Sequence, residues 1–544
     1  MEPLFPFAPV ADLPWLGYAS LLVIAVYFRF SRALTIRNLD LILTLLIAAA
    51  VVVSTHFRDE AYIAKVADSV DDASSDQSPS SNQPNPVSEI GGKRAEGTSE
   101  SSDPTEVPPE AKEAPSESNH IIKSSSNDEL SAEMLSTVEV SSTPDLRHPF
   151  YVWSSLALVV LAVLLVIRLL FDESLTRRPR LDQNLNQAGL AFLCVPAFVI
   201  LAFGVFEKPA PVTNVKAIEH GRALLQRREV QVENETNDVP APTETLIAAG
   251  GAAVAQLSGT LPNSVSVNTG ETRSTELLVA RILVIISHMV VVLGLLFIGR
   301  QHFSSIHLGV AMSCLYLLLP CTAANVHKLS HVLPAACLIW AIASYRKPMV
   351  AGVLLGLACG TLFFAVFLLP LWAVFYGRNG AIRFGASVVG VVIVLATCLM
   401  MISGDADSFY YRVVSSINWT VYRLLDDTLS ISQTPMSHLF IRIPMAAIFF
   451  VMLTAMTVLP RPRNLENLLT NSTALVVAAQ MWYPDDIGSY VQWYMPLFLL
   501  VVFRPRLDRF TPPEMIDRHA VSVSSDLPAG SQSTVAMSRI SLFR

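Results

Sequence analysis

The sequence predicts an all-α polytopic membrane protein with about 13 transmembrane segments, two of which form a short helical hairpin near 349–376. Three observations lead to this fold class. The 544 residues are 52% hydrophobic and only 15% charged, whereas ordinary soluble domains carry about 25% charged residues. Apolar runs of membrane-spanning length recur along the chain. Short loops rich in Arg and Lys separate many of these runs.

Each apolar run of roughly 20 residues predicts one spanning helix. The predicted helices lie near 15–30, 39–55, 149–170, 187–206, 277–298, 304–320, 331–345, 384–402, 437–459, 467–482 and 489–503. The N-terminus lacks the positive stretch of a signal peptide, so the first helix is expected to be retained.

The remaining apolar run, Met349–Tyr376, is too long for one untilted span. The positive-inside rule places short basic loops in the cytoplasm. Both Arg346 and Arg378 obey this rule only if the run enters and leaves the membrane as two short helices that turn near Gly360–Phe364. The alternative is one long tilted helix. With the hairpin, the positive-inside rule gives an extracytoplasmic N-terminus and a cytoplasmic C-terminus. We expect the protein to reside in the cell (inner) membrane.

Composition divides the chain into six parts. Residues 1–55 form an N-terminal helix pair, 149–206 a second pair and 277–503 the transmembrane core. Residues 56–148 are extracytoplasmic and mostly disordered, because this acidic, Ser- and Pro-rich stretch has too few apolar residues to fold. Residues 207–276 form an extracytoplasmic loop with an amphipathic helix, whose apolar side carries Val215, Ile218, Ala223 and Leu224 or Leu225 and is expected to lie on the membrane. Residues 504–544 form a disordered cytoplasmic tail.

Charge and cysteine usage exclude several classes. The formal net charge is −7 and no basic cluster is interleaved with aromatics, which argues against a nucleic-acid partner. The six cysteines lie in or beside apolar runs and contain no C-x-x-C pair, so they are expected to be small buried hydrophobes. No soluble catalytic motif is present. We therefore expect the lipid bilayer as a partner and no cofactor, with a divalent metal left open.

Acids at the predicted outer face are candidate site residues. Asp485 and Asp486 in "MWYPDDIGSYVQWYMPLF" could bind an acceptor at a cavity mouth together with Tyr490 and Trp493. Alternatively, the two acids favour the N-terminus of the following helix, and the aromatics belong to the interfacial belt. Asp59 in "HFRDEAY" and Glu219 could each supply an external carboxylate or be solvated residues outside a helix.

Cationic candidates form a second group. His327, Lys328 and His331 in "CTAANVHKLSH" could bind a phosphate or be solvated loop residues. Arg281 and His288 share one helix face because they are seven residues apart. For these two, the alternatives are a snorkelling Arg and a neutral His bonded between helices.

The stretch "YLLLPCTAANVHKLSHVLPAACLIWAIASYRKPMVAGVLLGLACGTLFFAVFLLPLWAVFYGRNGAIRF" (Tyr316–Phe384) resembles the membrane core of GT-C glycosyltransferases, closest to the polyprenyl-phosphate-sugar-dependent, mannosyltransferase-like family. "YPDDIGSYVQWYMPLFLL" is similar to the last outer loop of that family, and "VKAIEHGRALLQRRE" to the amphipathic helix of its first outer loop. The resemblance spans about 187–503.

The resemblance implies inverting sugar transfer from a polyprenyl-phosphate donor to an extracytoplasmic acceptor. An acid in the first outer loop would deprotonate the acceptor hydroxyl. This chain departs from the family at that place, which reads "PVTNVKAIE", so Glu219 or Asp59 is the expected base. Thr361 and Phe363 stand where the family often has a polar or basic residue.

The cations Lys328, His327, His331 and Arg281 would stabilise the departing phosphate of such a donor. Two other classes stay open at this point. One is a non-catalytic scaffold built on the same core. The other is a transporter, although the single hairpin has no counterpart in the other half of the chain, as internal repeats would require.

Overall fold

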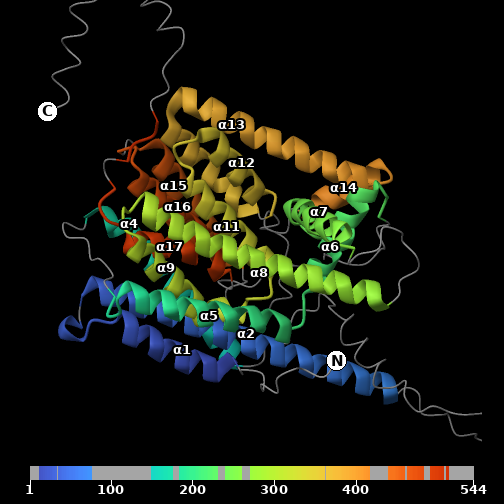
Figure 1. The fold of residues 1–544 in the computed structure, drawn as a ribbon, viewed down its shortest axis with the longest axis horizontal. Helices are drawn as coiled ribbons and strands as arrows, with labels where there is room; N and C mark the ends of the chain where they lie inside the picture. The colour runs from blue at the N-terminus through green and yellow to red at the C-terminus, as the bar shows by residue number, and fades with distance from the viewer. Residues whose placement is uncertain are drawn as a thin grey trace, which may run out of the picture. The chain divides into compact units, whose positions relative to one another are not determined.

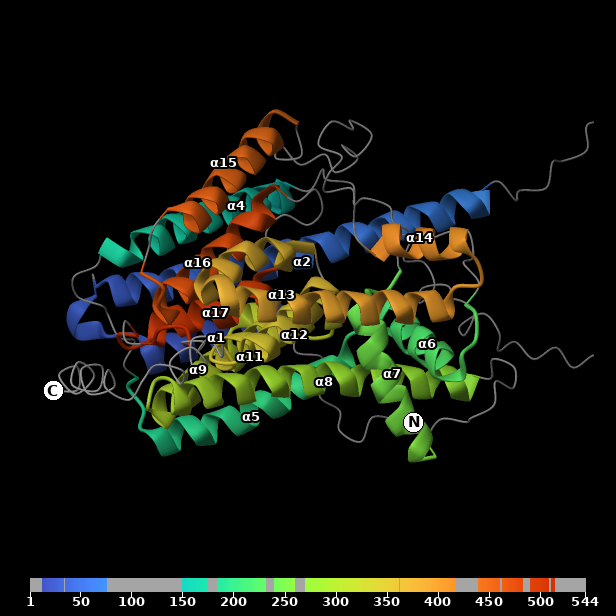
Figure 2. The ribbon, with the colours of Figure 1, turned by 90° about the horizontal axis from the view of Figure 1, so that it is seen from above.

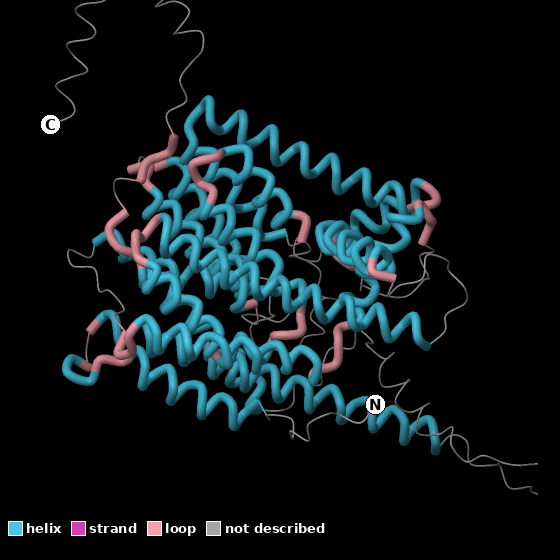
Figure 3. The backbone as a smooth tube through the Cα atoms, in the orientation of Figure 1, coloured by secondary structure: helices cyan, strands magenta, loops and turns pink. Residues whose placement is uncertain are grey.

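The computed structural model describes residues 12–33, 35–75, 149–174, 183–230, 239–259, 270–361, 363–416, 439–459, 462–482, 490–507 and 510–513. Within them all regular structure is helical (Figures 1 and 3). The α-helices are α1 Asp12–Tyr27, α2 Ile36–Ser75, α4 Pro149–Leu170, α5 Gln187–Glu207, α6 Val212–Gln226, α7 Pro242–Leu257, α8 Gly270–Gln301, α9 Ile306–Leu318, α10 Pro320–Ala324, α11 Leu329–Ala343, α12 Pro348–Cys359, α13 Leu368–Ile402, α14 Ala406–Ser416, α15 Leu439–Val458, α16 Leu465–Ala479 and α17 Val491–Phe503. Short 3₁₀ turns include η2 Phe171–Ser174 and η3 Phe363–Phe367.

Five segments of the described chain are long and apolar enough to cross a membrane. They are Ile36–Phe57, Trp153–Leu170, Gln187–Glu207, Ser274–Gln301 and Phe364–Ile402. Six further apolar helices are shorter, with 10–17 residues each. Many of the apolar side chains on these helices stay exposed in the protein, for example Phe192 and Val195 on α5. Exposed apolar surface of this kind suits a helix whose outer side meets lipid.

Most predicted helices lie within a few residues of the observed ones, but four predictions need correction. The helix predicted at 39–55 belongs to α2, which continues to Ser75. The helix predicted at 277–298 begins at Gly270, and Glu276 in its added turns pairs with Arg222 of α6. The basic residues 378–383 are helical, not a loop. The chain between α5 and α8 holds two helices, α6 and α7, where one was expected.

The chain reverses direction after α12. Helix α12 ends at Cys359, and the turn that follows leads through η3 into α13. The Tyr376 hydroxyl donates to the carbonyl oxygen of Tyr345 at 2.8 Å, so the chain has returned to the end of the bundle where α12 begins. Gly377 then bends α13 with a φ of 67°, a left-handed conformation that glycine adopts without strain. This reversal lies where the sequence predicts the hairpin turn.

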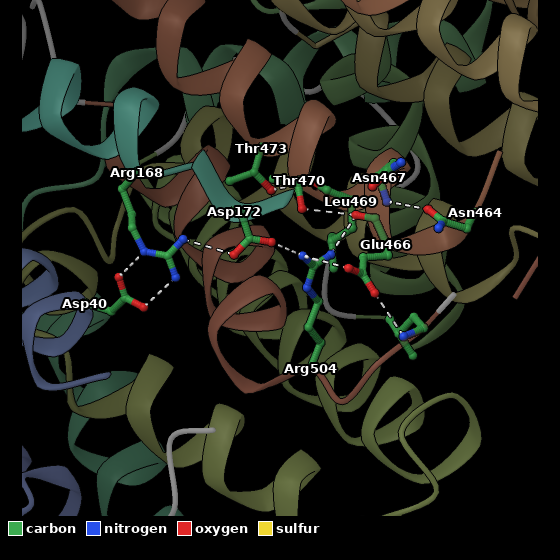
Figure 4. A network of polar contacts seen from close by, with 11 residues as sticks. Asp40, Arg168, Asp172, Asn464, Glu466, Asn467, Leu469, Thr470, Thr473 and Arg504 are labelled. Atoms are coloured by element: carbon green, nitrogen blue, oxygen red, sulfur yellow. Dashed lines mark hydrogen bonds and ion pairs between the residues drawn. The ribbon is translucent and has the colours of Figure 1, made fainter. Parts of the chain in front are cut away.

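Four buried charged side chains and the half-buried Arg168 form a chain of ion pairs at one end of the bundle, which we call the Arg504 end (Figure 4). Arg168 of α4 binds both carboxylate oxygens of Asp40 of α2, at 2.8 and 2.9 Å. It also contacts Asp172 at 3.0 Å. Arg504 pairs with Asp172 and lies 3.7 Å from Glu466 of α16. These contacts join the ends of α2, α4, α16 and α17.

The segment after α17 is hydrogen-bonded to the same network and to the start of α16. The backbone N–H of Leu507 donates to the Glu466 carboxylate at 3.1 Å, and the N–H of Leu465 donates to the Phe510 carbonyl at 2.8 Å. The Phe510 ring lies beneath the Arg346 guanidinium, 5.8 Å from ring centre to Cζ. The described part of the C-terminal segment is therefore packed against the bundle.

Helices α6, α7 and α14 gather at the opposite end, beside the first turns of α8 and the last turns of α13 (Figures 1 and 2). We call this the α7 end. Ala217 and Ile218 of α6 are buried, and α6 packs closely against α7. A Cβ at Gly221 would lie 2.4 Å from the backbone nitrogen of Ala249. A helix lies where the amphipathic helix is predicted, but Ile218 and Ala223 of its predicted membrane-facing side are buried within the protein.

Replacing Arg504 tests the ion-pair chain. Arg504→Met leaves two buried carboxylates, Asp172 and Glu466, without their shared cation, so unfolding becomes easier by about 3–5 kcal/mol. Thermal unfolding of the purified protein in detergent measures the loss. Arg300→Met is the control, because Arg300 is exposed. Equal unfolding temperatures for the two variants would show that the network does not hold the Arg504 end together.

A glycine pair tests the α6–α7 contact. Gly221→Ala forces the α6 and α7 backbones apart and destabilises their packing by about 1–3 kcal/mol. Gly250→Ala on α7 meets no atom within 4 Å and is expected to raise stability by about 0.5–1 kcal/mol through helix propensity. Limited proteolysis of both variants reads out the difference, and the contact is refuted if the two are cleaved at the same rate.

Candidate functional site

Polar side chains from distant parts of the chain meet at the α7 end. The Asn214 side-chain amide of α6 donates to the His327 carbonyl at 2.8 Å, in the loop before α11. The Thr243 backbone N–H of α7 donates to the Gly360 carbonyl at 3.2 Å, in the hairpin turn. The Trp493 indole of α17 donates to the Ser330 carbonyl at 3.3 Å. These bonds bring α6, α7, the hairpin turn, α11 and α17 to one region.

An aromatic cluster formed by His331, Tyr490, Trp493 and Phe364 occupies this region. The Tyr490 and Trp493 rings stack with centres 4.2 Å apart. The His331 ring lies 5.0 Å from Tyr490 and 6.2 Å from Trp493, and Phe364 of η3 lies 5.2 Å from Trp493. The sequence predicted His331, Tyr490 and Trp493 as site residues in two separate groups. The structure brings these three together.

The predicted cations Lys328 and His327 lie beside this cluster. Lys328 is the residue before α11, and both side chains are half-buried. A third cation, Lys208, donates through its ammonium to the Ala324 carbonyl at 2.9 Å. A half-buried ammonium attracts an anion more strongly than an ammonium in bulk water does, because the local dielectric is lower. This loop can therefore hold an anionic group.

Two other predicted residues lie elsewhere. Glu219 is on the exposed side of α6, while its neighbours Ile218 and His220 are buried. Arg281 of α8 lies over the Phe206 ring of α5, with Cζ 5.7 Å from the ring centre. The Arg281 guanidinium is thus engaged with the face of an aromatic ring.

Three predicted acids fall outside what the structure describes. Asp485 and Asp486 lie in the segment 483–489, and the side chain of Asp59 is likewise outside the described part of α2. The relation of these acids to the aromatic cluster stays a prediction.

His288 has the interhelical bonding expected of a neutral core histidine. One ring nitrogen lies 2.9 Å from the Tyr316 hydroxyl, and the other lies 3.1 Å from the Val326 carbonyl. A carbonyl accepts only, so the nitrogen facing it carries the proton and the other nitrogen accepts from the hydroxyl. This bonding ties α8 to the loop before α11.

Glu244 is the acid that the sequence analysis missed. It is the third residue of α7, its side chain is only 3% exposed, and its Oε1 atom has no hydrogen-bond partner among the described residues. The Ala241 backbone N–H donates to the carboxyl group, as in a capping box. Burial raises the pKa of Glu244 to about 7. The motif "APTE", with Pro at the first helical position and Glu at the third, was the available signal.

A second cationic group at the α7 end joins α6 to α14. The Arg412 guanidinium donates to the Val230 carbonyl at 2.5 Å. Burial, together with the nearby charges of Arg412 and Lys216, lowers the pKa of His220 to about 4. Around neutral pH His220 is therefore uncharged. Helix α14 was not predicted, because "DADSFYYRVV" has no long apolar run.

The arrangement has defined chemical abilities. A buried carboxyl whose pKa lies near 7 can take up a proton near neutral pH. A stacked Tyr–Trp pair offers an apolar face for a ring, and the Lys328 loop offers positive charge. Among the described residues, no group of three or more His, Cys, Asp or Glu side chains could hold a metal ion.

The raised pKa of Glu244 predicts a pH-dependent stability. In the unfolded chain this carboxyl ionises near its usual value of 4.5, but in the folded protein it ionises near 7. The folded state therefore binds the extra proton between these values. The contribution of Glu244 to stability is greatest below about pH 4.5 and falls as the pH rises to 7, by about 3 kcal/mol, since a tenfold change in proton affinity is worth about 1.4 kcal/mol.

Unfolding temperatures between pH 5 and 8 measure this dependence. Glu244→Gln removes the ionisable group, so the unfolding temperature changes less with pH. At pH 8 this variant is more stable than the wild type, because it buries no charged carboxylate. Glu219→Gln, at an exposed position of α6, keeps the wild-type slope. A wild-type profile that Glu244→Gln leaves unchanged would contradict the assignment.

Comparisons of the chain with protein-family models, with curated proteins and with solved structures each give no match.

Proposed function

We propose that the chain is a GT-C-like integral-membrane glycosyltransferase that moves a sugar from a polyprenyl-phosphate donor to an extracytoplasmic acceptor. One observation carries the proposal: a buried carboxyl, a stacked aromatic pair and half-buried cations lie in the region where α6, α7, the hairpin turn, α11 and α17 come together. A transferase of this kind needs these three elements, because it must activate a hydroxyl, hold a sugar ring and stabilise a departing phosphate.

Glu244 is the proposed general base, in place of Glu219 or Asp59. A base works best when its pKa lies near the working pH, and burial provides this for Glu244. Lys328, His327 and His331 are the proposed phosphate ligands. The ring pair of Tyr490 and Trp493 packs against the sugar. Asp485 and Asp486 precede this pair in sequence and are proposed to contact the acceptor.

The proposed topology has about 13 segments, with the α7 end outside and the Arg504 end in the cytoplasm. Basic residues at the Arg504 end support it, since Arg300 and the Arg346–Lys347 pair are at the end of α8 and after α11 on that side. The N-terminus is then extracytoplasmic and the C-terminus cytoplasmic, and the protein resides in the cell (inner) membrane.

A scaffold or a transporter fits the same region less well. A scaffold has no use for a buried carboxyl whose pKa lies near neutral pH. A transporter site is typically formed near the bilayer midplane by paired broken helices, whereas Glu244 lies at the start of α7, outside the five candidate spans. The location favours chemistry at the membrane surface.

Transfer of labelled sugar from polyprenyl-phosphate mannose or glucose to membrane acceptors tests the proposal. Glu244→Gln lowers the initial rate by about 10²- to 10⁴-fold, because the general base is lost, with little change in donor KM. Lys328→Ala weakens donor binding and raises KM. Glu219→Gln, on the exposed side of α6, keeps the wild-type rate.

The outcomes separate the alternatives. Loss of transfer in Glu219→Gln with full activity in Glu244→Gln would return the role of base to Glu219. Absence of transfer by the wild type with every common polyprenyl-phosphate hexose would refute the enzyme and favour the scaffold.

A further inference from the structure

Three buried polar atoms beside the aromatic cluster lack hydrogen-bond partners among the described residues. They are the Thr322 hydroxyl oxygen, the Asn325 amide nitrogen and the Gln492 amide oxygen. Each of these residues is only 1% exposed. Burying such a group without a partner is costly. Polar groups in this state mark an occupant that the protein itself does not supply, either a ligand or an internal water.

The three residues are neighbours. Thr322 lies in α10 and Asn325 is the residue directly after that helix, so the two are three positions apart on one turn. The Gln492 amide nitrogen of α17 donates to the Thr322 carbonyl at 3.1 Å, which holds α17 against this turn. The Cys321 thiol lies beside the Thr322 hydroxyl, but a thiol is a weak hydrogen-bond partner.

The chemistry of the group selects its ligand. The unpaired atoms offer one donor, one acceptor and one hydroxyl that can do either. None of the three carries a charge, so the group does not suit a phosphate or a carboxylate. Trp493 follows Gln492 directly in α17 and stacks on Tyr490 in the aromatic cluster, so aromatic rings lie close to this group. A sugar ring carries hydroxyl groups and a flat apolar face, so it suits neutral polar atoms that lie close to aromatic rings.

We propose that Thr322, Asn325 and Gln492 form a subsite for the hydroxyls of a neutral hexose ring. The subsite rests on the proposed function, because the hexose is the one carried by the polyprenyl-phosphate donor. The subsite sets which hexose is accepted, since a site built to hydrogen-bond a hydroxyl rejects a sugar that lacks it or presents it differently. The Lys328 loop holds the phosphate, and the subsite holds the ring.

Two binding measurements on the purified full chain in lipid nanodiscs test the subsite. One uses polyprenyl phosphate alone and the other uses the same lipid carrying mannose, glucose or galactose. The wild type binds at least one glycosylated lipid about tenfold tighter than the bare lipid. Thr322→Val and Gln492→Met each reduce this ratio about three- to tenfold, as expected for one lost hydrogen bond, and leave the bare-lipid affinity unchanged.

Thr473→Val is the matched control, because Thr473 is buried in α16 and its hydroxyl already donates to the Leu469 carbonyl at 2.8 Å. It leaves the ratio at the wild-type value. Unfolding temperatures show whether each variant is folded. If Gln492→Met does not fold, the test rests on Thr322→Val, which only replaces a hydroxyl with a methyl group.

The remaining outcomes distinguish the two proposals. Wild-type binding of both lipids with an unchanged ratio in the variants overturns the subsite, whose atoms then hold water, and leaves the transferase standing. Wild-type binding of neither lipid overturns the transferase and the subsite with it.

Discussion

Charge buried away from water must find opposite charge, and the helix ends at the Arg504 end are arranged around this requirement. Asp40, Asp172 and Glu466 share the two guanidinium groups of Arg168 and Arg504. Each Arg bridges two acids that come from different helices, so no helix end in the group can move alone without exposing an unpaired charge. The positions of α2, α4, α16 and α17 follow from this chain of pairs.

Near the α7 end, in contrast, several buried polar groups lack a partner. Among the described residues, Glu244 has no cationic partner, and Thr322, Asn325 and Gln492 each bury an atom without a hydrogen-bond partner. A protein gains no stability from this arrangement. The Arg504 end holds paired charges, and the other region holds incompletely paired polar groups. The first fastens the helices and the second is suited to a ligand, since preorganised polar groups are most effective in a low dielectric.

Helices with long apolar runs could be predicted from the sequence, since their periodicity is local. The reversal at Gly360 was predictable for a different reason, namely the two basic residues that flank the run. Helix α7 was missed because its Ala- and Gly-rich sequence carries little apolar pattern. Long-range contacts were out of reach: the pairing of Trp493 with the Ser330–His331 turn joins positions more than 160 residues apart, and the burial of Glu244 depends on α6 and the distant hairpin turn. The exposure of Glu219, beside the buried His220, likewise depends on which side of α6 meets α7.

The place of Arg504 in the chain has a consequence for how the protein is made. The acids Asp40 and Asp172 are synthesised more than 300 residues before Arg504, the cation that completes the network. While the ribosome works through the intervening helices, Asp172 has only Arg168, which it shares with Asp40. The network closes only after α17 has been made and Arg504 reaches Asp172, so the ends of the early helices are locked late in synthesis.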